Sequence, residues 1–353
     1  MKTEKLQSKM KQQGIEALLI SETSMIEYLI GTRFSVAERF LGLVITQRDV
    51  VLYLNRLFPY ENTELTIRRF DDTDNIIHTV ARSLTCAKLG VDHHLASGFL
   101  LSLMRYRPDI SFYVGSDIAD SVRCVKDKTE REAMRQASKL NDLAMTEVRA
   151  ILKLGMSEVE AALKIKQIFA TLTDEGVSFD PIVAFGDHTS DPHAEPGERT
   201  LTVGDAIIVD MGCRFHGFCS DMTRTFYMGE NPMKEIYDTV VQANLVAEAI
   251  IRPGIKLCDV DSAARNVIIA AGYGPLFIHR TGHGIGMEVH EPYDVSQTSE
   301  KMIEEGMCFS IEPGIYLEGI GGVRIEDLVL VTSTGVEVLN SFSKTTEVIE
   351  CLR

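Results

Sequence analysis

Two stretches of the chain repeat one pattern, and this pattern restricts the possible folds more than any other feature of the sequence. Residues 201–212 read LTVGDAIIVDMG and residues 303–314 read IEEGMCFSIEPG, so two glycines of one stretch align with two of the other. Each stretch predicts a turn, a short buried strand and then a carboxylate before a glycine, Asp210 in the first and Glu312 in the second. The repeat predicts a domain of two related halves, each of which places an acid at the end of a strand.

Each half also carries a second acid on a predicted neighbouring strand, Asp221 in GFCSDMTRTFYMG and Glu326 in GGVRIEDLVLVT. Because alternate residues of a strand share a face, we expect Asp221 to face the same way as Cys219 and Thr223. By the same rule, Glu326 shares a face with Arg324. Four carboxylates would then converge, and burying four uncompensated negative charges costs too much free energy. Either these acids are exposed and unrelated, or cations hold them.

The stretch HRTGHGIGMEVHE, residues 279–291, contains His279, His283 and His290, three of the nine histidines of the chain. A divalent transition metal among carboxylates commonly takes an imidazole ligand as well, and flanking glycines let the backbone approach closely. His283, which lies between two glycines, is therefore the best candidate for such a ligand. The alternative is a lone His-Gly turn that caps a strand, but the four acids at matching strand ends favour a metal site.

The N-terminal part of the chain alternates predicted helices and strands. A helix that ends at Gly14 is followed by a buried strand, and residues 41–54 predict two strands around a polar turn. Further strands are predicted at residues 88–92 and 110–115. Residues 1–122 therefore predict a small α/β domain that contains no cluster of catalytic residue types.

Two helix-start signals follow this region. Thr129 and Glu132 have the spacing of a capping box, and Ser157 starts a second helix in the same way. These signals place a domain boundary near residue 125. Residues 123–353, whose strands are rich in Gly, Asp and His, then form the domain that bears the site.

Composition disfavours several other classes of function. The formal net charge of −15, without a cluster of Lys or Arg, makes nucleic acid a poor partner. The apolar runs are shorter than the roughly 20 residues of a membrane span, and the charged N-terminus lacks the apolar core of a signal peptide. The sequence therefore predicts a cytoplasmic protein without a membrane partner. Its seven cysteines are scattered without a C-x-x-C pair, which is typical of reduced thiols rather than disulfides or a zinc site.

Five candidate ligands occur in the order Asp210, Asp221, His283, Glu312 and Glu326, with TGHGIG, EPGIY and VRIED around the last three. This set resembles that of the pita-bread metallopeptidases, and most of all their proline-specific branch, Xaa-Pro dipeptidase (prolidase) and Xaa-Pro aminopeptidase. The resemblance covers the whole chain. It implies an α/β (α+β) protein in which a creatinase-like N-terminal domain precedes a pita-bread catalytic domain with an internal pseudo-twofold.

The resemblance also implies a metal content and a ligand scheme. Two divalent metal ions per subunit, manganese first and cobalt or zinc as alternatives, would share Asp221 and Glu326 as bridging ligands. Asp210 would complete the coordination of one ion, and His283 and Glu312 that of the other. The substrate would be a peptide with proline in the second position, and the assembly would be a homodimer.

Further roles follow from the same resemblance. Glu312 would also move a proton during catalysis, while His290 and His193, the latter in SDPHAEP, would contact the substrate and the reaction intermediate. His279 would lie beside the metal pocket, and Arg324 would support the carboxylates.

The sequence departs from the proline-specific pattern at two places. The loop before His193 usually reads Ser-Gly-x-Asn, but here Phe185, Asp187 and His188 stand in those places, which alters the expected wall of the substrate pocket. Prolidases also tend to carry an arginine four residues after the second histidine, where it grips the carboxylate of a dipeptide, and this chain has Asp294. An Xaa-Pro aminopeptidase that acts on longer peptides, or a carboxylate anchor elsewhere, therefore remains open. A non-peptidase binding module on the same fold is the rival from another class, although metal-free members of the superfamily have lost ligands that this chain keeps.

Overall fold

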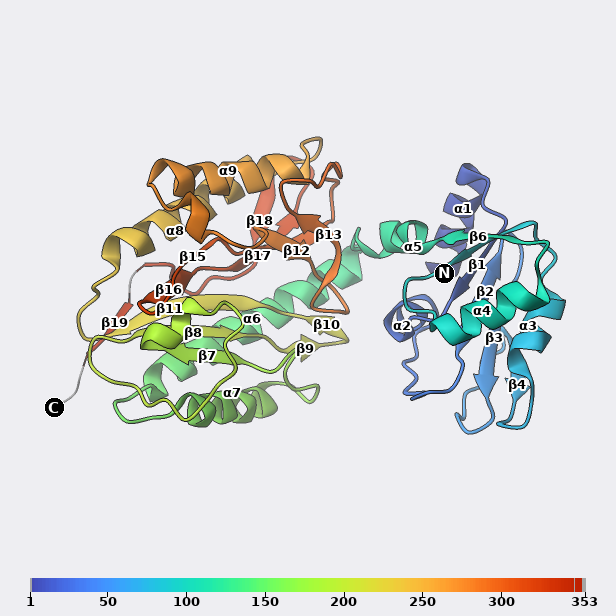
Figure 1. The fold of residues 1–353 in the computed structure, drawn as a ribbon, viewed down its shortest axis with the longest axis horizontal. Coiled ribbons are helices and arrows are strands. Elements are labelled where there is room, and N and C mark those ends of the chain that lie inside the picture. Colours follow the sequence, from blue (N-terminus) through green and yellow to red (C-terminus); the bar gives the residue numbers. More distant parts are fainter. Residues whose placement is uncertain (1, 346, 351–353) are drawn as a thin grey trace. The chain divides into compact units, whose positions relative to one another are not determined.

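The structure, a computed structural model, describes residues 2–345 and 347–350. The chain divides into two compact units, one that ends at Arg123 and one that begins at Cys124 (Figure 1). Within the described residues, none of the helices is long and apolar enough to cross a membrane.

The first unit is built on a six-stranded mixed sheet in the order β4-β3-β2-β1-β5-β6. All residues of β1 are buried, as expected for a continuous apolar strand inside a sheet. The strands are β1 (Ala17–Ile20), β2 (Gly42–Thr46), β3 (Val50–Asn55), β4 (Thr66–Phe70), β5 (Lys88–Val91) and β6 (Ser111–Val114). The helices are α1 (Lys2–Gln13), α2 (Thr23–Ile30), α3 (Ile76–Ser83), α4 (Ser97–Tyr106) and α5 (Ser116–Arg123). Helix α1 ends at Gly14 as predicted, and the φ of +68° at this residue is one that glycine adopts readily.

The long helix α6 (Lys128–Ile151) opens the second unit, and its cap differs from the prediction. The capping box is formed by Asp127 and Glu130 instead of Thr129 and Glu132. Asp127 Oδ1 accepts hydrogen bonds from the backbone N–H groups of Thr129 and Glu130 at 2.9 and 3.0 Å, and Glu130 Oε2 accepts from the N–H of Asp127 at 2.7 Å. An aspartate is a better N-cap than a threonine, and its negative charge also interacts favourably with the helix dipole. The prediction of the cap was therefore wrong by two residues.

The second unit contains the same arrangement of elements twice. In the first half, α6 and α7 precede the antiparallel strands β7, β8 and β11, and in the second half α8 and α9 precede β12, β14 and β17. The helices are α7 (Glu158–Leu172), α8 (Lys234–Ile250) and α9 (Leu257–Ala270). The strands are β7 (Ile182–Phe185), β8 (Ala206–Met211), β11 (Met222–Met228), β12 (Gly282–Gly284), β14 (Cys308–Ile311) and β17 (Asp327–Val331). Strands β8 and β14 are those of the sequence repeat, so the predicted relation between two halves is confirmed.

The remaining elements extend or connect these halves. Strand β19 extends the first sheet in the order β19-β11-β8-β7, and β13 and β18 complete the second in the order β13-β12-β14-β17-β18. Two antiparallel pairs, β9 with β10 and β15 with β16, lie outside both sheets. The bounds are β9 (Arg214–Phe215), β10 (Phe218–Cys219), β13 (Glu291–Val295), β15 (Gly314–Leu317), β16 (Gly321–Arg324), β18 (Val336–Val338) and β19 (Glu347–Ile349), with short 3₁₀ helices at Gly186–Ser190 and Gly274–Leu276.

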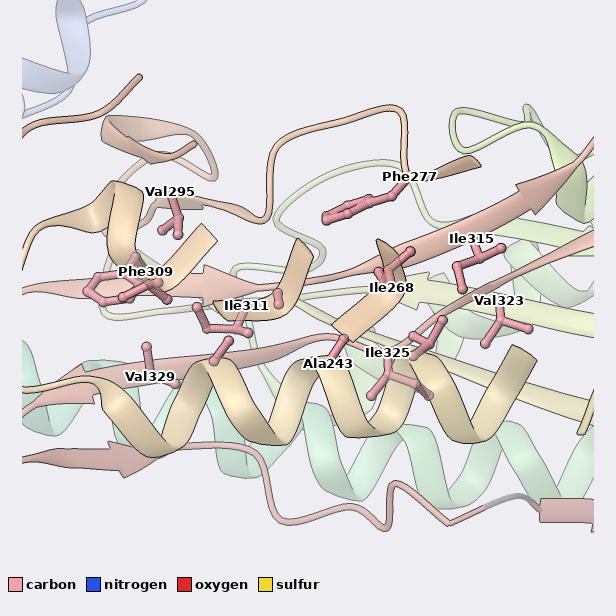
Figure 2. Packing of buried hydrophobic residues seen from close by; sticks show 14 of the residues in the cluster. Ala243, Ile268, Phe277, Val295, Phe309, Ile311, Ile315, Val323, Ile325 and Val329 are labelled. Atoms are coloured by element: carbon pink, nitrogen blue, oxygen red, sulfur yellow. The ribbon is translucent and has the colours of Figure 1, made fainter. Parts of the chain in front are cut away.

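Each pair of helices packs against the strands of its own half. Phe169 of α7 and Val209 of β8 belong to one buried cluster. A second cluster joins Ala243 of α8 and Ile268 of α9 to Ile311 of β14 (Figure 2). Because burial of such side chains is the main source of folding free energy, the strand ends that carry the acids rest on a rigid support.

Candidate functional site

All nine residues singled out in the sequence line one pocket of the second unit, with a volume of about 530 Å³. They are His193, Asp210, Asp221, His279, His283, His290, Glu312, Arg324 and Glu326. The side chains come from both halves of the unit, so the fold assembles the pocket from segments that are far apart in the chain.

The pseudo-twofold explains how the four acids meet. Asp210 lies at the end of β8 and Glu312 directly follows β14, whereas Asp221 and Glu326 directly precede β11 and β17. Strands β8 and β11 pair with Met211 opposite Met222, which brings the two acids of the first half together. Strands β14 and β17 pair in the same antiparallel sense. The halves are joined where the N–H of Glu326 donates to the carbonyl of Thr223 at 3.1 Å.

A buried asparagine holds each acid-bearing strand end to the long helix behind it. The Nδ2 group of Asn141, in α6, donates to the carbonyl of Met211 at 2.8 Å. The Nδ2 group of Asn244, in α8, donates to the carbonyl of Ile311, also at 2.8 Å. Because an unpaired carbonyl buried at a strand end would be costly, both helices stabilise the geometry of the acids.

The carboxylates are buried with part of their hydrogen-bonding capacity unused. Asp221 and Glu326 are 4% and 1% exposed. Asp210 Oδ1, Asp221 Oδ1 and Glu326 Oε1 are buried and have no hydrogen-bond partner. Ligand atoms of Asp221, His283 and Glu326 all lie within 4.8 Å of one another, which is close enough to hold one metal ion. Buried oxygens without hydrogen-bond partners at such a position could act as ligands of a cation.

Burial sets the protonation of this cluster. It raises the pKa of Asp221 and of Glu326 well above the usual range, and the neighbouring carboxylates raise both further. Burial also raises the pKa of Glu312 to about 7. Such shifts measure how unfavourable the shared negative charge is, and a bound divalent cation would remove the cause.

His283 is oriented as a ligand. Its Nδ1 group donates to the carbonyl of Gly284 at 3.1 Å, which leaves Nε2 as the lone-pair nitrogen. This Nε2 lies 3.4 Å from Glu312 Oε1 and 3.7 Å from Asp221 Oδ2. Burial lowers the pKa of His283 to about 3, so the ring is neutral at physiological pH, as metal binding requires.

Arg324 ties the acids of both halves together. Its Nη2 donates to Asp210 Oδ2 at 2.8 Å, and its Nε donates to Thr223 Oγ1 at 3.1 Å. Thr223 in turn donates to Glu326 Oε2 at 2.8 Å. The guanidinium also fixes the loop that carries His193, because Nη1 donates to the carbonyl of Pro192 at 3.1 Å.

Tyr316 is a site residue that was not singled out in the sequence. Its hydroxyl accepts from Arg324 Nη1 at 3.0 Å and donates to His279 Nε2 at 3.0 Å. His279 Nδ1 donates to the carbonyl of Arg280 at 2.7 Å, and burial lowers the pKa of His279 to about 4. The available signal was the motif EPGIY, in which Tyr316 follows Glu312 on the next strand.

His193 and His290 are the exposed histidines of the pocket. The ring of His290 packs edge-on against that of His283, with centroids 4.3 Å apart and an interplanar angle of 81°. Burial lowers the pKa of His290, and the positive charge of Arg280 lowers it further. Both rings line the pocket, and His290 is biased toward its neutral form.

The altered loop at residues 185–188 does not form the pocket wall, so that expectation was wrong. Phe185 is buried in the core of the first half, because it continues the apolar face of β7. His188 Nδ1 lies 2.9 Å from Glu158 Oε1, and Asp187 pairs with an arginine at the surface. Apolar side chains line the pocket instead, namely Phe179, Ile182, Pro192 and Val289.

The single strand expected through Cys219, Asp221 and Thr223 is also interrupted. Strand β10 ends at Cys219, whose Sγ contacts the carbonyl of Met287 at 3.5 Å, and β11 begins only at Met222. Cys219 does not line the pocket. Ser220, whose N–H donates to the carbonyl of Cys213, turns the chain from the β9–β10 hairpin into the sheet.

Two family models match the chain. Residues 132–333 match the model of metallopeptidase family M24, and residues 2–125 match that of the creatinase/prolidase N-terminal domain. The chain belongs to metallopeptidase family M24. The resemblance found in the sequence is therefore confirmed, including the creatinase-like domain ahead of the pita-bread catalytic domain. Family M24 is a metallopeptidase family, and Asp221, His283 and Glu326 of this chain could hold a metal ion.

The M24 chain is similar to peptidases over nearly its whole length. An uncharacterized peptidase of Staphylococcus aureus (strain USA300) is 34% identical over 97% of this chain and 99% of the relative. The crystal structure of a dipeptidase from Pyrococcus horikoshii OT3 has a TM-score of 0.90 at 37% identity, covering 99% of this chain and 100% of the other. An Xaa-Pro dipeptidase from Bacillus anthracis has a TM-score of 0.88 at 30% identity, with 99% of each chain covered.

Proposed function

We propose that this M24 peptidase hydrolyses the peptide bond between an N-terminal residue and proline in Xaa-Pro dipeptides, at a site with two divalent metal ions. One observation carries the proposal: buried carboxylate oxygens without hydrogen-bond partners, on Asp210, Asp221 and Glu326, face a neutral imidazole inside one pocket. The similar structures of a dipeptidase and of an Xaa-Pro dipeptidase support the choice of substrate.

The donor set fits two cations better than one. In our scheme the ions would be held by the carboxylates of both halves and by one imidazole, namely Asp210, Asp221, His283, Glu312 and Glu326. Carboxylate oxygens with a single imidazole favour manganese, with cobalt or zinc as alternatives. When bound, the two ions would bring the pKa of a coordinated water toward neutrality and so provide hydroxide for attack on the peptide carbonyl.

In this proposal Glu312 transfers the proton from the attacking water to the leaving amine. It lies at the end of β14 beside the ligand cluster, with Oε1 3.4 Å from His283 Nε2, where a carboxylate can accept a proton and release it again. Ser310 Oγ donates to Glu312 Oε1 at 3.2 Å and holds the carboxylate in place. Glu312 therefore takes a proton during attack and passes it to the leaving amine.

The exposed histidines stabilise the negative charge that develops on the substrate oxygen. His290 is packed against His283, so its ring has a defined position next to the ligand cluster. His193 projects from the loop that Arg324 fixes through Pro192. Hydrogen-bond donors held rigidly before the reaction contribute more than mobile ones, because they need no reorganisation.

The remaining wall of the pocket suits a proline ring. Phe179, Ile182, Pro192 and Val289 offer apolar surface beside the polar cluster. Burial of the pyrrolidine ring against this surface would favour binding in proportion to the apolar area covered. A scissile bond to proline lacks an N–H, and the proposed proton transfer requires only its nitrogen lone pair.

The test is a hydrolysis assay of the protein loaded with Mn²⁺. Three substrates are compared, each with and without chelator: an Xaa-Pro dipeptide, an Xaa-Pro-Xaa tripeptide and a Met-Ala-Ser peptide. We expect chelator-sensitive cleavage of the dipeptide, and Asp221→Asn should abolish it. Faster cleavage of the tripeptide would show an aminopeptidase, and absence of metal-dependent cleavage of all three would refute the proposal.

A further inference from the structure

We propose that Arg280, held in place by Asp294, binds the free carboxylate of the substrate and thereby limits the enzyme to dipeptides. This inference rests on the proposed function and deepens it, because it names the residue that selects the length of the peptide. The anchor comes from position 280, just before β12, rather than from position 294 on β13.

The first argument is the distribution of charge in the pocket. Among the described residues that line it, Arg280 and Arg324 carry permanent positive charges. Arg324 is 3% exposed, and it is committed to Asp210, Thr223 and Tyr316. Arg280 is thus the pocket arginine with donors available to a ligand.

The second argument is the state of the Arg280 side chain. It is 34% exposed, and its Nη1 donates to Asp294 Oδ1 at 2.7 Å. A guanidinium offers five N–H donors in a planar fork. One bond to Asp294 therefore fixes the group and leaves an edge that can bind a carboxylate with two parallel hydrogen bonds.

The third argument is how the backbone places this pair. The N–H of Thr281 donates to the carbonyl of Val295 at 2.9 Å, and Gly282 lies opposite Val295 in the β12–β13 ladder. Arg280 and Asp294 each directly precede one of the residues of this contact, and their side chains meet at 2.7 Å across the two segments. Arg280 lines the same pocket as Glu312 and His290.

A carboxylate anchor at this position excludes longer peptides for a simple reason. In a dipeptide the residue after the scissile bond ends in a carboxylate, whereas in a longer peptide the same place holds a neutral amide. Loss of a charge-assisted hydrogen bond weakens binding by about tenfold to hundredfold. The four pocket acids would repel a carboxylate further if the arginine were absent.

The test compares an Xaa-Pro dipeptide with its Xaa-Pro amide, using the Mn²⁺-loaded enzyme. Arg280→Ala should lower the ratio of kcat/KM between acid and amide by about tenfold or more, mainly through KM of the acid. Arg280→Lys should restore part of the ratio. Arg135→Ala is the matched control, because Arg135 is 38% exposed and pairs with Glu337 away from the pocket, and it should leave the ratio unchanged.

An equal loss for acid and amide in Arg280→Ala would overturn the inference, because it would show a structural role alone. Calorimetric titration with N-acetylproline and N-acetylprolinamide measures the same preference without turnover. If the wild-type protein cleaves no Xaa-Pro peptide, the proposed function fails, and this titration still decides the role of Arg280. Binding of the acid in preference to the amide, lost in Arg280→Ala, supports the anchor, and equal binding of both refutes it.

Discussion

Asp221 and Glu326 stand at equivalent points of the two halves, each directly before the second strand of an antiparallel pair, β11 or β17. Thr223 connects them across the junction, because it lies two residues after Asp221 and donates to Glu326 Oε2 at 2.8 Å. Each acid keeps one buried oxygen without a partner. The fold therefore holds at its centre two carboxyl groups whose ionised forms are unfavourable without a cation, which is the expected cost of a preformed cation site.

Asp221→Asn tests the ligand role directly. The amide keeps the size of the side chain but loses the charge, so we expect metal affinity to fall by more than about 100-fold and activity to be lost. Metal content after dialysis, together with hydrolysis of an Xaa-Pro dipeptide, measures both effects. Asp187→Asn is the control, since Asp187 pairs with Arg199 at the surface, and it should keep the metal. Full metal content in Asp221→Asn would contradict the assignment.

Glu326→Gln should make the metal-free protein more stable at pH 8. The folded-state pKa of Glu326 is raised by burial and by neighbouring carboxylates, so the folded protein binds more protons than the unfolded chain above the usual pKa of a carboxyl group. Stability is therefore lost as pH rises from about 4, and for Glu312 this loss extends to a pKa of about 7.

Urea denaturation in chelator, at pH 5 and at pH 8, measures this effect. We expect Glu326→Gln to gain roughly 1 kcal/mol or more over the wild type at pH 8, and less at pH 5, where the wild-type cluster is largely protonated. Added Mn²⁺ should stabilise the wild type but not the variant. A variant less stable than the wild type at pH 8 without metal would show that the buried charge is compensated by other means.

His290→Ala separates catalysis from metal binding. We expect metal content to stay intact and kcat to fall by about 10², which is typical for removal of one donor to a developing oxyanion. His94→Ala, at an exposed histidine of the first unit, is the control for loss of an imidazole. An unchanged kcat in His290→Ala would remove this residue from the mechanism.

Tyr316→Phe should lower metal affinity and activity, although it replaces none of the proposed metal ligands. It removes the hydroxyl that links Arg324 to His279, and Arg324 then holds Asp210 less firmly. Partners of ligands typically contribute about 10- to 100-fold to metal affinity or activity. Tyr227→Phe is a closely matched control, because the buried hydroxyl of Tyr227 has no hydrogen-bond partner. Equal effects of both variants would refute the proposed link.

The acids and His283 could be predicted from the sequence because strand ends and glycine turns are local patterns. Tyr316 and Arg280 could not, since their roles depend on where other strands place their partners. The position of the Arg280 side chain depends on its hydrogen bond to Asp294, a residue of β13 that lies 14 positions later in the chain.

Two further predictions differed from the structure because neighbouring residues gave competing local signals. Asp127 and Thr129 both start a pattern that ends in glutamate, and only the structure shows that the aspartate caps α6. Alternation predicted a common face for Cys219 and Asp221, but the chain leaves the β9–β10 hairpin at Ser220 before it enters β11. The rule that alternate residues share a face fails where one strand ends and another begins within a few residues.

The last prediction concerns Lys126 and Glu291, an ion pair whose side chains are both 1% exposed, with Nζ 2.8 Å from Oε2. Glu291 Oε1 also accepts from the N–H of Met287 at 2.9 Å, so the pair holds the turn that carries His290. Lys126→Met leaves a buried carboxylate without its cation, and we expect the free energy of unfolding to fall by about 3 kcal/mol or more. Lys301→Met, at an exposed pair with Glu304, should cost less than about 1 kcal/mol.

The double variant Lys126→Met with Glu291→Gln separates the effect of the ion pair on stability from its effect on kcat. The double variant has no ionised carboxylate at this buried position, so part of the stability lost in Lys126→Met should return. Because the turn that carries His290 loses the ion pair in both variants, we expect kcat to be lower than in the wild type in both, even where stability recovers. Urea denaturation gives the stabilities, and hydrolysis of an Xaa-Pro dipeptide gives kcat. If kcat recovers together with stability, the pair contributes to folding only and does not position His290.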